Sequence, residues 1–255
     1  MPTRFASFSS FLALFFFLAT PTSLPAQEPG PDQFDISGIK LGRHGGPALK
    51  KEIEALPERY KCLDINIEKN GQKKLMGYSC FVPQAPNSPF KEVSFKAIEI
   101  LNNATSQLFF LFDEDSSNVW FIFKMEKFKN EKDAPLPTTL AEALEKKYGK
   151  CDKWSMGCVW SFDRNGKKSS FWFGLSGLSN FPSIKSAPYS SVPIPTSFKA
   201  DQGIGLEVSV ESNNYQLILY DVRDQYDRWA AAKAKMDAAK KAEEERKQAI
   251  PAPSF

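Results

Sequence analysis

Residues 60–82 read YKCLDINIEKNGQKKLMGYSCFV and contain two strand candidates, Tyr60 to Glu68 and Lys73 to Val82. Asn70 and Gly71 lie between the two candidates. This dipeptide is a strong short-range signal for a hairpin, because a type I′ turn needs positive φ at both central residues. The stretch therefore predicts an antiparallel β-hairpin.

The register of this hairpin brings two cysteines together. If Asn70 and Gly71 form the loop, position 69 faces position 72, and Cys62 faces position 79. One β-bulge would move Cys62 opposite Cys80, within reach of a disulfide. On the chain-entropy model, closing that loop would stabilise the fold by about 3 kcal/mol.

The chain has four cysteines, and their number favours disulfides over a metal site. Three pairings are possible for Cys62, Cys80, Cys151 and Cys158, and the pattern favours Cys62–Cys80 and Cys151–Cys158. Two disulfides are the usual outcome for an even set of cysteines in an exported chain. A zinc site is the alternative, but the spacing lacks a C-x2-C pair and there is one histidine.

The order of elements around the hairpin occurs twice. A helix, a tyrosine, a cysteine, a strand, an Asn-Gly pair and a second strand span about residues 47–82, and again about residues 138–174. Apolar residues line one face of each predicted helix at helical spacing: Leu49, Ile53 and Leu56 in the first, and Leu140, Leu144 and Tyr148 in the second. The recurrence predicts two pseudo-repeated lobes.

Further strands and a long helix complete the predicted fold. Strands are predicted at Val93–Leu101, Gln107–Asp113, Asn118–Phe128, Gly203–Glu211 and Tyr215–Val222. A helix is predicted from Arg223 to Gln248, and its narrow apolar stripe includes Tyr226, Trp229 and Met236. Its first half should dock on the body and its second half should project into solvent. A docked and then solvated helix is favoured over a partner-binding helix, because the far half offers little apolar surface. The fold class is α+β, with antiparallel sheets and short helices in the two lobes plus this C-terminal helix.

The first 26 residues have the pattern of a secretory signal peptide. Arg4 precedes the apolar run Phe11–Ala19, and a polar segment follows that ends at Ala26. That run is much shorter than the about 20 residues that span a bilayer, and no cysteine follows it closely, so release is expected rather than anchoring. The expected organisation is a signal peptide at 1–26, a first lobe at 27–130, a second lobe at 131–222, and a C-terminal helix and tail at 223–255.

The segment Phe34–Gly42, together with the helix after it, resembles the entry segment of small bacterial envelope modules. Such modules occur in outer-membrane assembly lipoproteins and in beta-lactamase inhibitory proteins, where a helical segment precedes an antiparallel sheet. The recurrence at Leu140–Gly149 looks like a second unit of this kind. The resemblance covers about a third of the chain, and no functional residues are carried over from it.

The motifs that could carry chemistry are weak. His44, beside Arg43 in Gly42–Gly46, precedes a helix and could help to hold an anion, although an exposed loop is favoured. The carboxylates of Asp113–Asn118 suggest calcium, but a polar hairpin loop fits better because the distal glutamate of an EF-hand is missing. Ser176 lies in a segment that approaches a nucleophile elbow without its last glycine. No catalytic, cofactor or metal residues are assigned.

These observations favour an exported, non-enzymatic protein of the periplasm or the extracellular space. It is expected to bind an envelope protein or a ligand through residues 176–200 or through the exposed end of the last helix. A formal net charge of +3 argues against nucleic acid as a partner, because no concentrated basic face is indicated. The alternatives are a periplasmic hydrolase of envelope material, using carboxylates or Ser176, and an inhibitor of a secreted enzyme.

Overall fold

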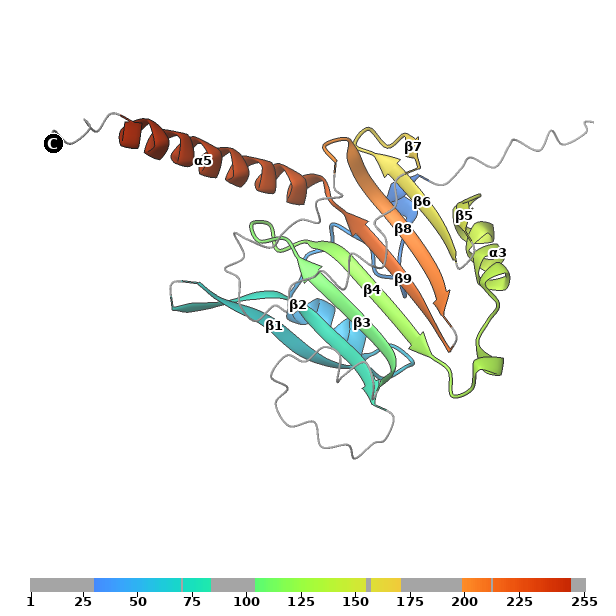
Figure 1. Cartoon of the computed structure of the whole chain (residues 1–255). Helices are drawn as coiled ribbons and strands as arrows, with labels where there is room; N and C mark the ends of the chain where they lie inside the picture. Colours follow the sequence, from blue (N-terminus) through green and yellow to red (C-terminus); the bar gives the residue numbers. More distant parts are fainter. Residues whose placement is uncertain are drawn as a thin grey trace, which may run out of the picture.

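Nine strands form one antiparallel sheet in this computed structural model (Figure 1). The structure describes residues 30–69, 71–83, 104–154, 157–170, 199–211 and 213–248. The predicted signal peptide, the predicted strand Val93–Leu101, Ser176 and most of the segment 176–200 lie outside these residues. The α+β class predicted from the sequence is confirmed.

The elements follow one another in a simple order, and most of the described chain belongs to the sheet. The strands pair in the spatial order β1-β2-β3-β4-β9-β8-β6-β5, and β7 also pairs with β6. In chain order the elements are η1 (Pro31–Gln33), α1 (Pro47–Glu54), β1 (Lys61–Lys69), β2 (Gln72–Pro83), β3 (Ala104–Phe112), β4 (Val119–Lys127), η2 (Glu131–Asp133), α3 (Pro137–Tyr148), β5 (Asp152–Trp154), β6 (Gly157–Asp163), β7 (Lys168–Ser169), β8 (Gln202–Glu211), β9 (Asn214–Asp221) and α5 (Arg223–Gln248).

The β1–β2 hairpin has the predicted register, including the bulge. Lys69 faces Gln72 at the turn, and the register shifts between Ile65 and Asn66. Beyond that shift Cys62 faces Cys80, as one inserted residue requires. Gly71 has a φ of 75°, in the left-handed region that favours glycine at this turn.

The sheet is continuous across the two halves of the chain. β4 of the first half pairs with β9 of the second, with Phe121 opposite Tyr220 and Lys124 opposite Leu217. The sequence left open whether the two lobes share one core. One cluster of buried residues includes Ile53 of α1 and Tyr148 of α3, so both helices pack on the same face of this shared sheet.

The second half departs from the first at its Asn-Gly turn. There β7 has only two residues and pairs with β6 on the edge that β5 also uses, while β8 pairs with the other edge. In the first half the second strand of the hairpin, β2, lies between β1 and β3. The two halves therefore share their order of elements. The second strand of the hairpin, however, lies inside the sheet in the first half and at the outer margin of the described sheet in the second half.

The aromatic residues of β3 and β4 are divided between two faces of the sheet, because successive side chains of a strand point to opposite sides. Phe110 and Phe112 of β3 belong to the cluster under the helices, whereas Phe121 of β4 belongs to a second cluster on the other face, and Phe109 of β3 packs against it. Among the described residues, no helix is both long enough and apolar enough to cross a membrane.

Candidate functional site

The four cysteines form two disulfides in the structure. Cys62 on β1 is joined to Cys80 on β2, and their Cα atoms lie 4.0 Å apart. Cys151 is joined to Cys158 on β6 across a Cα–Cα distance of 5.8 Å. These are the two pairs that the sequence pattern favoured, and each sulfur is bonded to another sulfur of the chain.

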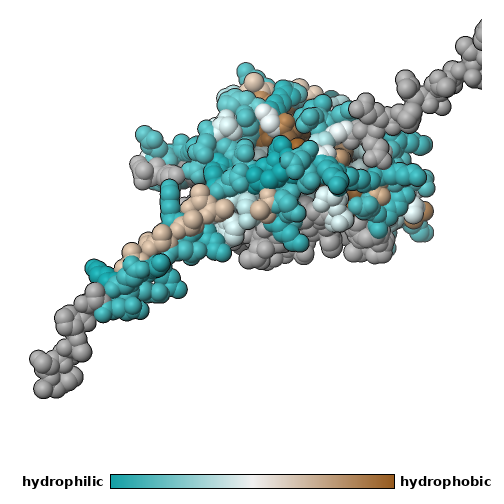
Figure 2. Space-filling view, turned by 90° about the horizontal axis from the view of Figure 1, so that it is seen from above, coloured by the Kyte–Doolittle hydropathy of each residue, from teal (hydrophilic) through white to brown (hydrophobic). Residues whose placement is uncertain are grey.

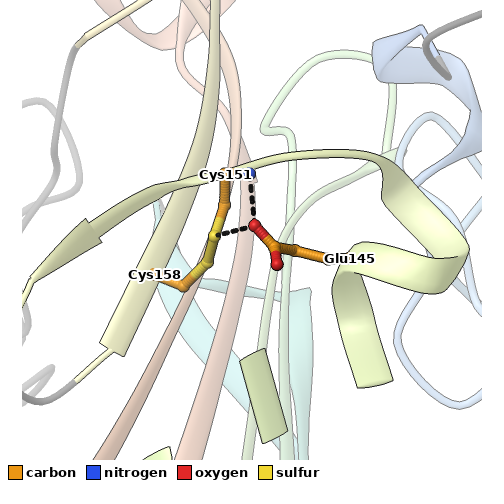
Figure 3. Close-up of side chains that lie close together, drawn as sticks. All are labelled: Glu145, Cys151 and Cys158. Atoms are coloured by element: carbon orange, nitrogen blue, oxygen red, sulfur yellow. Dashed lines mark hydrogen bonds between the residues drawn. A yellow bond between two sulfur atoms is a disulfide. The ribbon is translucent and has the colours of Figure 1, made fainter. Parts of the chain in front are cut away.

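Glu145, in the last turn of α3, points at the second disulfide (Figure 3). Its Oε1 accepts a hydrogen bond from the backbone N–H of Cys151 at 3.2 Å and lies 3.4 Å from the Sγ atom of Cys151. Oε2 pairs with Lys153 Nζ at 2.9 Å. The hydrogen bond from Lys153, followed by the one from Cys151 N–H, lowers the pKa of Glu145, so its carboxyl group is ionised at neutral pH.

This cluster has the residue types of a metal site but not the required chemical state. The ligand-type atoms of Glu145, Cys151 and Cys158 all lie within 4.8 Å of one another. A cysteine binds a metal as a thiolate, however, and both of these sulfurs are committed to a disulfide. In the oxidised protein the cluster therefore offers one carboxylate, which is already paired with Lys153.

The loop after β3 holds the base of α5 rather than leaving its carboxylates open. Asp113 is buried, and its Oδ1 accepts from the backbone N–H groups of Asp115 at 2.9 Å and Ser116 at 2.8 Å. Its Oδ2 accepts from Gln225 at 3.1 Å and from Arg228, both on α5. This is the arrangement of a hydrogen-bonded polar loop, the interpretation preferred over calcium in the sequence.

Further charged pairs fix the first turns of α5. Arg164, in the turn after β6, pairs with both carboxylate oxygens of Asp227 at 3.0 and 2.7 Å. The same guanidinium group lies 5.6 Å from the ring centre of Tyr226. Arg223 pairs with Asp221 at 2.9 and 2.6 Å. The hydrogen bond to Asp227 raises the pKa of Arg164, so this pair stays charged across the neutral range.

The distal half of α5, residues Lys233–Gln248, has a different environment. Every residue in it is exposed, and Met236 retains 70% of its accessible surface. Figure 1 shows the helix extending away from the sheet. The sequence prediction of a helix that docks first and then projects into solvent is confirmed.

One side of this helix carries small residues. Ala231, Ala234, Ala238 and Ala242 are all exposed and share one face, which we call the alanine stripe. Figure 2 shows weakly apolar residues along one side of the projecting helix and hydrophilic residues along the other. Lys235 and Lys241 border the stripe on either side at helical spacing.

The other sequence candidates lie apart from this helix. His44 is exposed, and its backbone bridges to Asn118. The guanidinium group of Arg43 is engaged by both carboxylate oxygens of Glu52, which lowers the pKa of Glu52. An anion at this loop would have to compete with Glu52 for Arg43.

Sequence reasoning missed a polar cluster around Lys124. This lysine lies on β4, and its Nζ pairs with Glu126 at 2.7 Å and lies 3.8 Å from a carboxylate oxygen of Glu58. It also donates to Ser37 Oγ at 3.3 Å. The available signal was a lysine within the apolar run of β4. Its partners connect the sheet to segments that precede it in the chain, which is a structural role.

Comparisons with family models, with curated proteins and with solved structures found no match to this chain. The resemblance to envelope modules therefore stays a prediction. The projecting half of α5 stands out, because all of its residues are exposed and none packs into the core of the described protein.

Proposed function

We propose that the chain is an exported, non-enzymatic binding protein that holds another envelope protein along the distal half of α5. The observation that carries this proposal is the contrast within one helix. Ion pairs from Asp113 and Arg164 fix its base, whereas Lys233–Gln248 makes no buried contact. At 1.5 Å per residue, the exposed part extends about 24 Å beyond the body.

A helix without an apolar face packed on its own protein needs other support. Alanine-rich sequence supplies high helix propensity, and the pairs Lys241–Glu245 and Glu243–Lys247 have i,i+4 spacing. Such pairs contribute only a few tenths of a kcal/mol each. Most helical stability in proteins comes from tertiary packing, so a second protein against this segment would stabilise what the chain leaves unpacked.

The alanine stripe sets the chemistry of the proposed partner. Small side chains allow the backbone of another helix to approach closely. Lys235 and Lys241 flank the line of approach, and Lys241 also lies 3.8 Å from Glu245 of the same helix. A partner helix with acidic residues on both sides of its contact face would complement them. The two disulfides support the exported setting, since such bonds persist in oxidising compartments.

The proposal can be tested by site-specific photo-crosslinking in cells that make the protein. A photoreactive residue replaces Ala238 on the stripe in one variant and Lys240 in the matched control. Position 240 points about 200° away from position 238 around the helix. A discrete protein adduct should form from position 238 and be largely absent from position 240. Equal adducts from both positions, or none from position 238, would contradict the proposal.

A further inference from the structure

The two disulfides differ in how far solvent reaches them. Cys62 retains 8% of its accessible surface, and Cys80 and Cys158 retain none. Cys151 is only half-buried, at the end of the loop that leaves α3. Of the four cysteines, Cys151 is therefore the most accessible to an external reagent.

We propose that Cys151 Sγ is a site of thiol–disulfide exchange, and that Glu145 makes it select thiols without an additional negative charge. The co-reactant is a small thiol that has lost its proton to solvent. Its thiolate attacks Cys151 Sγ and forms a mixed disulfide, while the bond to Cys158 breaks. The bonding electron pair goes to Cys158 Sγ, which then takes a proton from water.

The position of Glu145 gives the selectivity. Its Oε1 lies 3.4 Å from the sulfur under attack, and the ammonium group of Lys153 is held at the other oxygen, where 55% of the lysine side chain is exposed. An incoming thiolate therefore meets the carboxylate of Glu145 beside its target sulfur, together with the ammonium group of Lys153 at the other carboxylate oxygen and the nearby charge of Lys150. A second negative group on the thiol adds repulsion, whereas an ammonium group on the thiol offsets it.

The buried partner sulfur makes the exchange reversible. Cys158 is fully buried in the cluster beneath the helices, where desolvation disfavours a thiolate. It is consequently a poor leaving group, and the exchange should be slow. The mixed disulfide at Cys151 should persist only while the external thiol is in excess.

The test compares three thiols on the intact protein. Cysteamine, 2-mercaptoethanol and 2-mercaptoethanesulfonate are applied at equal thiolate concentration, and the products are trapped by alkylation. Peptide mass spectrometry then reports each disulfide separately. Cys151–Cys158 should open before Cys62–Cys80, and cysteamine should react about three- to tenfold faster than the sulfonate.

Variants isolate the role of Glu145. Glu145→Gln keeps an oxygen to accept from Cys151 N–H but removes the charge, so the rate ratio between cysteamine and the sulfonate should fall at least threefold. Lys153→Gln should raise that ratio, and Glu142→Gln, an exposed control on α3, should leave it unchanged. Both rates of the ratio are measured on the same variant, so a change in solvent access to Cys151 affects both and leaves their ratio unchanged. Equal ratios in Glu145→Gln and the wild type would overturn the proposal, as would simultaneous opening of both disulfides.

Discussion

The guanidinium group of Arg228 on α5 pairs with the carboxylate of Asp113, a residue 115 positions earlier in the chain. This pair connects the last helix to the loop that joins β3 to β4. Only 8% of the Asp113 side chain is exposed, and its carboxylate oxygens accept hydrogen bonds from groups of the protein. This contact between distant parts of the sequence is one of several that hold the base of α5.

Removing this arginine should loosen the base of α5. Arg228→Ala leaves Asp113 with Gln225 and the loop donors, and should cost about 1–2 kcal/mol of unfolding free energy. Amide hydrogen exchange over residues 223–232 should accelerate more than exchange in the sheet. Lys240→Ala, an exposed change further along the same helix, is the control. Unchanged exchange in Arg228→Ala would show that the pair does not hold the helix.

The two disulfides should differ modestly in their contribution to stability. On the chain-entropy model, Cys62–Cys80 contributes about 3 kcal/mol and Cys151–Cys158, which closes a shorter loop, about 2.5 kcal/mol. Replacing each pair with alanine and measuring urea unfolding checks this order. A loss well below 1 kcal/mol for the β1–β2 pair would mean that the unfolded chain already keeps the hairpin.

Acid should weaken the contact between α3 and the N-terminal segment. Burial works to raise the pKa of Asp35, but hydrogen bonds from Lys147 and the N–H of Gly38 outweigh it and hold the pKa below its usual range. Such a carboxylate stabilises the fold above its unfolded pKa of about 4 and loses that contribution as the pH falls. The urea concentration at the unfolding midpoint of the wild type should fall between pH 6 and pH 3. The midpoint of Asp35→Asn should fall by a smaller amount over the same range.

The control for this experiment is Asp152→Asn, a change at an exposed aspartate on β5. It should keep the acid sensitivity of the wild type. If Asp35→Asn lost as much stability on acidification as the wild type, the titrating group would lie elsewhere.

Tyr220 requires a glycine on the neighbouring strand. Its ring lies over Gly205 of β8, and its hydroxyl group donates to Glu207 Oε1 at 2.8 Å in the buried sheet. A Cβ atom at position 205 would collide with the hydroxyl end of Tyr220. Gly205→Ala should therefore cost about 1–3 kcal/mol in urea unfolding. Gly30→Ala, where an added Cβ meets nothing within 4 Å, should be neutral; equal losses at both positions would refute the packing explanation.

Local patterns predicted the hairpin, the helices and α5 because their determinants lie close together in the sequence. The need for one bulge followed from the cysteines, since a single inserted residue brings Cys62 opposite Cys80, but its position, with Met76 as the extra residue, did not. The pairing of β4 with β9 could not be predicted, because many registers between distant strands satisfy the same apolar pattern. The second Asn-Gly pair predicted a strand that reaches about position 174. The structure describes its start as β7, Lys168–Ser169, and positions 171–174 lie outside the described residues.

The candidate site was predicted in outline but not in its contacts. The sequence indicated a helix whose far half, beyond Met236, offers little apolar surface for burial. The contact of Glu145 with Cys151 depends on how the end of α3 meets β6, and the partner of Arg228 lies far away in the sequence. Both are tertiary relationships without a local signature.

The outer strands of the sheet determine how the molecule can associate. Within the described residues β1 pairs only with β2, and its exposed side chains include Lys61, Asp64 and Glu68. At the opposite margin, β5 and β7 have three and two residues, too few to template a longer strand. The charged side chains of β1 at one margin and the short strands β5 and β7 at the other disfavour growth of the described sheet by addition of a strand. At these described edges, side-chain contacts are therefore favoured over edge-to-edge pairing of backbones.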